Sequence, residues 1–309
     1  MNKLGYACIN LTLESSKIRT NRTMTRKTFD TKGLNYVSQL AIKNIDDLET
    51  VIKWNIQNNI QAYRLPDDLF PWKSEYEYQD LPNYSLIVKK LQSIGDYCRK
   101  HNHRLSQHPG QFNILASNRD DVVKKTIREL NQHSKIFDMM GFNTDHNTKI
   151  NIHVGAHYND KIGTMNRFCE NFYHLDTNCQ KRLTVENDDK KGLYTIQDLM
   201  YIHNKINIPL VFDYFHHNIH NDGFGEKETL ELAISTWPKD ITPVVHFSST
   251  KKIYEPVEKV KEQAHADYIY QKCETYGKDL IIILESKAKD LSIFKYRKDY
   301  ESSERSLSL

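Results

Sequence analysis

Histidines and carboxylates recur in this sequence at or near the ends of short apolar runs. The residues in this position are His108, His153, Glu186, Asp213, His216, His246 and Glu285. One such residue is usually a satisfied surface or capping group. Six consecutive runs that each end in one are different, because neighbouring carboxylates repel one another unless cations hold them. Imidazole and carboxylate donors together suit zinc, manganese or iron, so the pattern predicts a metal centre.

The set of donors is larger than a single ion needs, since one ion takes about four to six ligands. Two or three divalent ions in contact can bridge a phosphate, generate hydroxide and stabilise a leaving oxygen. The sequence therefore favours a cluster of two or three divalent ions that acts on a phosphate group.

Eight short β-rich runs provide the elements that must position these donors. They are Lys3–Ile9, Gln61–Leu65, Arg104–Gln107, Lys149–Val154, Arg182–Glu186, Ile208–Phe212, Thr242–Phe247 and Asp279–Leu284. Stretches with helical periodicity lie between them, and Asn44 and Ser85 are expected to start two of the helices. The alternation predicts one α/β domain, a (β/α)₈ TIM-type barrel of residues 1–295, followed by a polar tail of residues 296–309.

In such a barrel the active site lies at the C-terminal ends of the strands, which is where the donors stand in the sequence. A doubly wound open sheet is the structural alternative. No Gly-rich phosphate fingerprint follows the first run, which weakens that alternative. For the same reason no nucleotide cofactor is expected.

The composition fits a globular protein, with 39% hydrophobic residues and a formal net charge of +3. This small charge leaves the partner open, because a DNA-binding face needs only a local positive excess. The five cysteines form no Cys-x-x-Cys pair, which argues for a reducing compartment and against a thiolate zinc site. No apolar run approaches the ~20 residues of a membrane span. We expect a soluble intracellular monomer with no membrane partner.

The segment after the first run is basic. Its cations are Lys17, Arg19, Arg22, Arg26 and Lys27, and its acids are Glu14 and Asp30. Charge runs are often solvated loops without a partner. In a barrel, however, this segment lies on the same face as the metal donors, and there contact with DNA phosphates becomes the better interpretation.

Nine segments closely resemble the ultraviolet damage endonucleases, relatives of endonuclease IV and of the xylose-isomerase-like barrels. They are Leu4 to Asn10, Tyr63 to Leu65, Ser106 to Phe112, Asn151 to Gly155, Thr184 to Asp188, Asp213 to His217, Val245 to Ser249, His265 to Tyr268, and Leu284 to Lys289. They run in the family's order and cover nearly the whole chain. Any one of them alone would be weak.

The resemblance implies hydrolysis of the phosphodiester immediately 5′ of cyclobutane pyrimidine dimers and 6-4 photoproducts in double-stranded DNA. It implies a divalent cluster in which Mn²⁺ is the expected metal and Zn²⁺ or Mg²⁺ the alternative. The implied ligands are His108, His153, Glu186, Asp213, His216, His246, His265 and Glu285, with catalysis placed on Glu186, Asp213, His246 and Glu285. Glu186 would bridge two ions, and His216 and His265 would help to hold a third.

The resemblance also implies how the lesion is held. Gln111 and Phe112 match the family's Gln-Tyr pair that probes the duplex, although Phe112 lacks the tyrosine hydroxyl. Tyr6 and Asn10 would line the pocket for the extruded lesion; without the family match, Tyr6 would be taken as a residue that fills the barrel. Asn187 and Asp188 are expected to support the metal ligands.

Two further positions depart from the family pattern. The family usually has a histidine after Ser74, where this chain has Glu75, which we keep as a weaker ligand candidate. The family often has a lysine two residues before the seventh-strand histidine, where this chain has Val244. The occupancy of the third metal position therefore stays open.

Three other functions fit parts of the pattern. An apurinic-site endonuclease or a sugar isomerase would share the barrel and the metals, but an isomerase has no use for a basic first loop and a probing pair. A lesion-binding protein that no longer cuts would explain the substitutions at positions 75 and 244.

Overall fold

The strands form a closed parallel barrel. The computed structural model describes residues 3–255 and 258–301. Its strands are β1 (Lys3–Ala7), β2 (Ala62–Arg64), β3 (Arg104–Ser106), β4 (Ile150–Ile152), β5 (Leu183–Glu186), β6 (Leu210–Val211), β7 (Val244–Phe247) and β8 (Ile281–Leu284). Two runs of paired strands, β3-β2-β1-β8-β7 and β4-β5-β6, are joined by the bridges Gln107 to Ile150 and Asp213 to His246.

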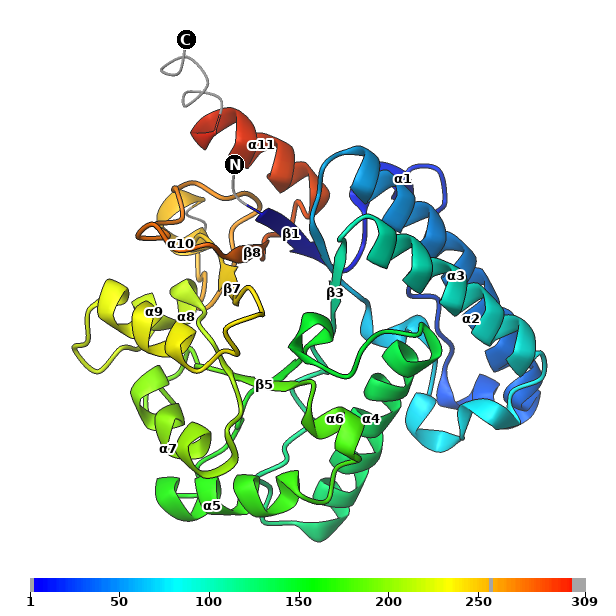
Figure 1. The fold of residues 1–309 in the computed structure, drawn as a ribbon, viewed down its shortest axis with the longest axis horizontal. Coiled ribbons are helices and arrows are strands. Elements are labelled where there is room, and N and C mark those ends of the chain that lie inside the picture. Colours follow the sequence, from blue (N-terminus) through cyan, green and yellow to red (C-terminus); the bar gives the residue numbers. More distant parts are fainter. Residues whose placement is uncertain (1–2, 256–257, 302–309) are drawn as a thin grey trace.

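Helices surround this barrel (Figure 1). They are α1 (Leu11–Glu14), α2 (Arg26–Gln57), α3 (Tyr84–Lys100), α4 (Asp120–Met139), α5 (Lys161–Phe172), α6 (Thr177–Gln180), α7 (Ile196–Ile206), α8 (Tyr214–Ile219), α9 (Glu226–Ser235), α10 (Lys251–Tyr254) and α11 (Asp290–Tyr300). Short 3₁₀ turns lie at Asp67–Leu69, Lys73–Glu75, Tyr78–Asp80 and His146–Thr148. Among the described residues, no helix combines the length and the apolar character that a bilayer crossing requires.

The barrel architecture predicted from the sequence is confirmed. Each of the eight expected runs contains one strand, and the apolar positions Val122, Val123 and Ile127 lie on α4 as their helical spacing indicates. Ser85 is off by one residue, because α3 begins at Tyr84.

The predicted helix start at Asn44 is wrong. Asn44 is buried in the middle of α2, and its side-chain nitrogen donates to the carbonyl oxygens of Arg22 and Leu69. Asparagine is frequent at helix starts because its side chain competes for backbone groups. Here the side chain satisfies backbone groups of neighbouring loops instead, and the helix begins at Arg26, with a break at Gly33 where φ is +57°.

The barrel interior is closely filled. A Cβ atom at Gly5 of β1 would lie 2.5 Å from the Ala62 carbonyl oxygen and 2.7 Å from Ile283 Cδ1, so glycine is required where β1 passes between β2 and β8. On the opposite face of the same strands, Tyr6 and Tyr63 pack edge to face with ring centroids 5.1 Å apart, and the Tyr6 hydroxyl reaches Asn55 of α2. Both tyrosines are fully buried. This packing leaves chemistry to the ends of the strands.

The C-terminal helix belongs to the barrel domain. The boundary expected at residue 295 falls inside α11, where Tyr296 is fully buried and Arg297 donates to the Asn58 carbonyl oxygen at 2.8 Å. The expectation of a tail from residue 296 is therefore wrong up to Tyr300, because aromatic residues continue the buried face of the helix. Residues 302–309 lie outside the described part.

Candidate metal centre

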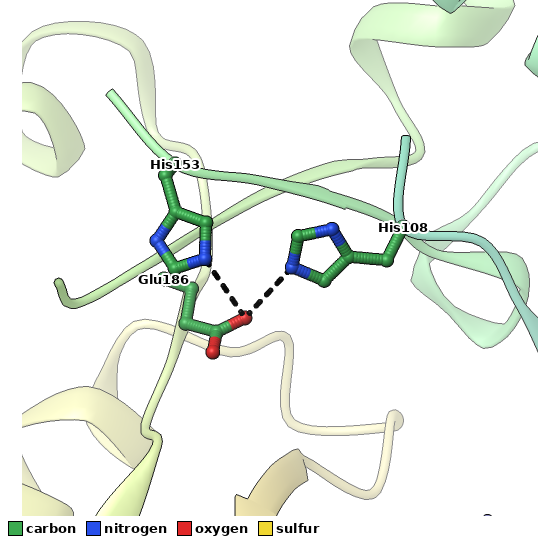
Figure 2. A group of neighbouring side chains, drawn as sticks. All are labelled: His108, His153 and Glu186. Atoms are coloured by element: carbon green, nitrogen blue, oxygen red, sulfur yellow. Dashed lines mark ion pairs between the residues drawn. The ribbon is translucent and has the colours of Figure 1, made fainter. Parts of the chain in front are cut away.

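Glu186, the last residue of β5, is the centre of a cluster of histidines. The Nε2 atoms of His108 and His153 point at one carboxylate oxygen, Glu186 Oε2, from 3.4 and 4.0 Å (Figure 2). His108 follows β3 and His153 follows β4, so three neighbouring strands supply this group. Its ligand atoms lie within 4.8 Å of one another, a spacing that one ion could bridge.

A second group shares the same carboxylate. It consists of Glu186, Asp213 and His246, with ligand atoms again within 4.8 Å of one another. His246 Nδ1 lies 3.0 Å from Glu186 Oε2 and 3.1 Å from Glu285 Oε1. His216 Nδ1 lies 3.4 Å from Glu186 Oε1. Two ligand groups that share one carboxylate are the arrangement that two bridged ions need.

The donor set suits a cation by its chemistry and also because a buried donor atom in it lacks a hydrogen-bond partner. Asp213 Oδ2 is buried and makes no hydrogen bond to any residue that the structure describes. A buried carboxylate oxygen without a donor is costly, and a divalent ion would satisfy it. The residues present therefore suit the metal cluster that the sequence indicates.

Residues behind the ligands fix their orientation. Asn187 accepts from the Asp213 backbone N–H at 2.8 Å and donates to the Asp213 carbonyl oxygen at 3.0 Å. Asp188 Oδ1 lies 3.3 Å from His153 Nδ1, and the Asn151 amide donates to Glu186. These are the contacts that the expected supporting role of Asn187 and Asp188 requires, and Asn151 adds a third.

Electrostatics in the cluster favour cations. Burial would raise the pKa of Glu186, but His246 and His153 outweigh it and hold that pKa well below its ordinary value. Burial would lower the pKa of His153, but Glu186 and Asp188 raise it to about 10. Burial raises the pKa of Asp213 to about 6 despite the proximity of His216. Protons and divalent ions compete for these lone pairs, so metal binding weakens as the pH falls.

His265 stands at the edge of the cluster. Its Nδ1 lies 2.8 Å from Ser248 Oγ and 2.9 Å from the Glu285 carbonyl oxygen, and its ring packs on Phe215 with centroids 4.9 Å apart. These contacts hold the Nδ1 side of the ring, which is the support that a ligand using Nε2 needs.

Two cations that the sequence patterns did not single out also reach the cluster. Arg64 of β2 donates to Glu285 and, against burial, holds the pKa of that carboxyl well below its usual range. Lys149 is fully buried, and its Nζ lies 3.3 Å from His246 Nε2. Lys149 and Val244 line the same small cavity in the barrel interior, so a lysine from another strand approaches the site where the family's lysine is absent. Their contacts cross the barrel, so sequence spacing could not reveal them.

Glu75 is not brought into either ligand group. It lies in the 3₁₀ turn Lys73–Glu75, and its Oε2 is 3.2 Å from Arg26 Nη1. This ion pair satisfies the Glu75 carboxylate at the surface, so Glu75 has a structural role in this conformation.

The basic segment is more neutral than its sequence suggests. Arg19 pairs with Glu14 at 3.5 Å, Arg22 with Asp47 at 2.7 Å, and Arg26 with both Asp30 and Glu75. The fold thus adds two acids from outside the segment. Arg26 and Lys27 lie in the first turn of α2 rather than in a loop, and Lys27 remains exposed.

Gln111 and Phe112 line a cavity of about 570 Å³, together with Glu186 and Glu285. Gln111 is exposed, and the Phe112 side chain is 81% exposed, which excludes an ordinary core role for this aromatic. A large apolar side chain held in water beside the candidate metal ligands indicates a partner surface.

Tyr6 and Asn10 do not line this cavity. Both are buried, the Tyr6 hydroxyl donates to Asn55 Oδ1 at 2.8 Å, and the Asn10 amide donates to the Tyr6 hydroxyl at 2.8 Å. Asn10 also caps α1 through Leu13 N–H. In this conformation Tyr6 faces the layer between the barrel and α2, so it neither lines the cavity over Glu186 nor fills the barrel interior, the role it would be given without the family match.

A partly buried ionic network supports the segment that carries His108. Lys73 Nζ lies 2.7 Å from Asp67 Oδ1 and 2.8 Å from Glu129 Oε1. His133 Nε2 lies 2.9 Å from Asp67 Oδ1, and its other nitrogen bonds to Gln107. Asp67, Glu129 and His133 also form a group with ligand spacing, but the Lys73 ammonium already sits between its carboxylates.

The fold and the rim of donors define a barrel protein equipped for divalent metals. The chain matches the family model described as UV-endonuclease UvdE over residues 2–307, and it belongs to this family. It is 32% identical over 304 residues to a putative UV-damage endonuclease of Acanthamoeba polyphaga mimivirus, covering 95% of this chain and 89% of that protein.

Solved structures agree with this assignment. The crystal structure of SacUVDE superimposes with a TM-score of 0.85 at 28% identity, covering 98% of this chain and 99% of that one. Endonuclease IV from Thermus thermophilus gives 0.57 at 13% identity over 97% of this chain and 99% of that one, which shows a shared fold.

Replacing Glu186 with Gln should reduce the metal content of the protein. Glutamine keeps the size of the side chain but removes the charge that both ligand groups share, so we expect Mn²⁺ affinity to fall at least about tenfold. Elemental analysis after dialysis measures the bound ions per chain. The exposed Glu170→Gln variant is the control, and a wild-type ion count in Glu186→Gln would contradict the shared role.

Replacing Glu129 with Gln should destabilise the protein in a pH-dependent way. Burial would raise the pKa of Glu129, but His133 and Lys73 bring it down to about 2. A lowered pKa stabilises the fold above the unfolded value near 4.5, and this stabilisation is lost as the pH falls towards 2. We expect a loss of up to about 3 kcal/mol at pH 7 that shrinks between these values.

Urea denaturation of both proteins across this range measures the difference. The exposed Glu228→Gln variant should match the wild type throughout. A difference in unfolding free energy that does not change with pH would show that the Glu129 charge is not involved.

Proposed function

We propose that this protein is a metal-dependent endodeoxyribonuclease that cuts double-stranded DNA immediately 5′ of ultraviolet photoproducts. The observation that carries the proposal is the cavity that holds both the shared carboxylate Glu186 and the exposed pair Gln111 and Phe112. The shared carboxylate suits phosphodiester hydrolysis, and the exposed pair suits the detection of a distorted duplex. The family membership supports the same function.

The metals proposed are two or three divalent ions, with Mn²⁺ preferred over Zn²⁺ or Mg²⁺. The proposed ligands are His108, His153, Glu186, Asp213, His216, His246, His265 and Glu285. When bound, the ions would supply a nucleophile at neutral pH and stabilise the charge that develops on the phosphate. Imidazoles mixed with carboxylates suit Mn²⁺ better than Mg²⁺, which prefers oxygen alone.

The side chains around the ions have separate tasks in this proposal. Arg64 lines the cavity and donates to Glu285, so its remaining N–H groups can donate to oxygens of the scissile phosphate. Lys190 lines the same cavity and adds positive charge. Phe112 fills the space that the lesion leaves when it turns out of the stack, a step that costs least for bases that already pair poorly.

The ion pairs of the basic segment change which of its residues we propose as DNA contacts. Lys27 remains a candidate phosphate contact, while Arg19, Arg22 and Arg26 would have to exchange their carboxylate partners for phosphates. Tyr6 and Asn10 would serve the lesion pocket only after their mutual hydrogen bond opens. An intracellular location follows from the proposed DNA substrate.

The rival functions predict different surfaces. A sugar isomerase gains nothing from Phe112 in solvent, whereas an abasic-site endonuclease could use the same wedge. A protein that binds without cutting would not need to keep the two ligand groups around Glu186. The fold shared with endonuclease IV does not separate these alternatives, because function resides in the site.

A nicking assay on closed circular plasmid tests the proposal. We expect nicks in irradiated plasmid with Mn²⁺, none with EDTA, and few in untreated plasmid. Equal nicking of depurinated and irradiated plasmid would favour the abasic-site enzyme. Tight binding of irradiated plasmid without any nicks would overturn the proposed catalysis.

Changing Gln111 and Phe112 together to Ala tests the wedge. Stacking of one aromatic on bases contributes about 1–3 kcal/mol, so we expect the preference for photoproduct duplex over intact duplex to fall roughly tenfold. Competition binding with two labelled duplexes gives this ratio directly. Equal weakening on both duplexes would mean that the pair contributes general affinity and does not probe.

A further inference from the structure

A second cavity, of about 620 Å³, opens beside the metal centre between α8 and the segment that follows β7. Its wall includes Phe215, Ser248, Thr250, Tyr254 and Gln271. It is as roomy as the cavity of about 570 Å³ over Glu186, and both fall in the range of about 300–1,000 Å³ of small-molecule sites. The proposed function leaves this second cavity without a role.

This second cavity adjoins the metal centre through His265. Ser248 Oγ lies 2.8 Å from His265 Nδ1, and the Phe215 and His265 rings are 4.9 Å apart. Thr250 is paired with His265 through a backbone bridge. The wall of the second cavity is therefore in direct contact with His265, the proposed ligand at the edge of the cluster.

The wall offers a surface on which a base can stack. The Tyr254 side chain is 39% exposed, and its ring stacks on Tyr270 with centroids 5.2 Å apart and an interplanar angle of 14°. Its hydroxyl donates to Gln271 Oε1 at 2.8 Å, which fixes the ring. A fixed, partly exposed aromatic ring is the platform used for unstacked bases in single strands.

The charges at the second cavity suit a nucleic-acid backbone. Lys191 and Lys252 both line it, and the Glu262 carboxylate in its wall lies 3.3 Å from Lys252. Lys190, the neighbour of Lys191, lines the cavity over Glu186. Adjacent lysines, Lys190 and Lys191, therefore face the two cavities, so that each cavity has one cation able to contact the same phosphate backbone.

We propose that the second cavity binds the nucleotide on the 5′ side of the scissile phosphate, with its base stacked on Tyr254. The inference rests on the proposed function, in which the photoproduct lies 3′ of that phosphate, turned out of the stack that Phe112 fills. The strand then continues past His265 into the second cavity. The enzyme would thus hold unstacked nucleotides on both sides of the cut and would sense the base that precedes the lesion.

The test removes the Tyr254 ring and the base on the 5′ side of the lesion, first each alone and then both together. One photoproduct duplex carries a normal base 5′ of the lesion, and the other carries an abasic analogue there; both have a non-cleavable phosphonate at the scissile position. Equilibrium Kd values are measured for the Mn²⁺-loaded wild type and for Tyr254→Ala. Tyr254→Phe, which keeps the ring, and Tyr173→Ala, an exposed aromatic at the end of α5, are the controls.

We expect the wild type to lose roughly tenfold in affinity when the flanking base is removed. Tyr254→Ala should lose about the same on the normal duplex and nothing further on the abasic one, while both controls behave as the wild type. The inference would be overturned if the wild type bound both duplexes with the same Kd. It would also be overturned if Tyr254→Ala lost as much affinity on the abasic duplex as on the normal one. Failure here with intact nicking of irradiated plasmid would leave the proposed function standing.

Discussion

One carboxylate organises the site. Glu186 ends β5 in the middle of the barrel rim and is approached by histidines from β3, β4, β7 and α8. Such a carboxylate is stable in a buried position only if cations face it from several sides. The closed parallel sheet supplies this condition, because it brings the C-terminal ends of all strands to one face. The proposed metal cluster, the cavity above it and the proposed DNA surface all depend on that convergence.

Much of this could be predicted from the sequence, because the period of the apolar runs and the chemistry at their ends are local signals. Eight runs and a donor after six of them are enough to define a barrel and to place His108, Glu186, Asp213 and His246 together. The convergence is real, since these residues form the two ligand groups in the structure.

The rest depends on contacts between distant segments. Arg64 and Lys149 meet the cluster across the barrel, and Asp47 and Glu75 neutralise arginines of a segment that looked strongly basic. Asn44 looked like a helix cap because its side chain does bond to backbone groups, although these belong to other loops. Burial of Tyr6 and Asn10 likewise follows from packing against Asn55, which no motif encodes.

The central claim is that Glu186 is shared by two metal ions. A crystal of the protein with Mn²⁺, measured at a wavelength where manganese scatters anomalously, tests it directly. The account predicts two anomalous peaks on either side of the Glu186 carboxylate, one next to His108 and His153 and the other next to Asp213 and His246. A single peak at the rim, or peaks only between Asp67 and Glu129, would contradict it.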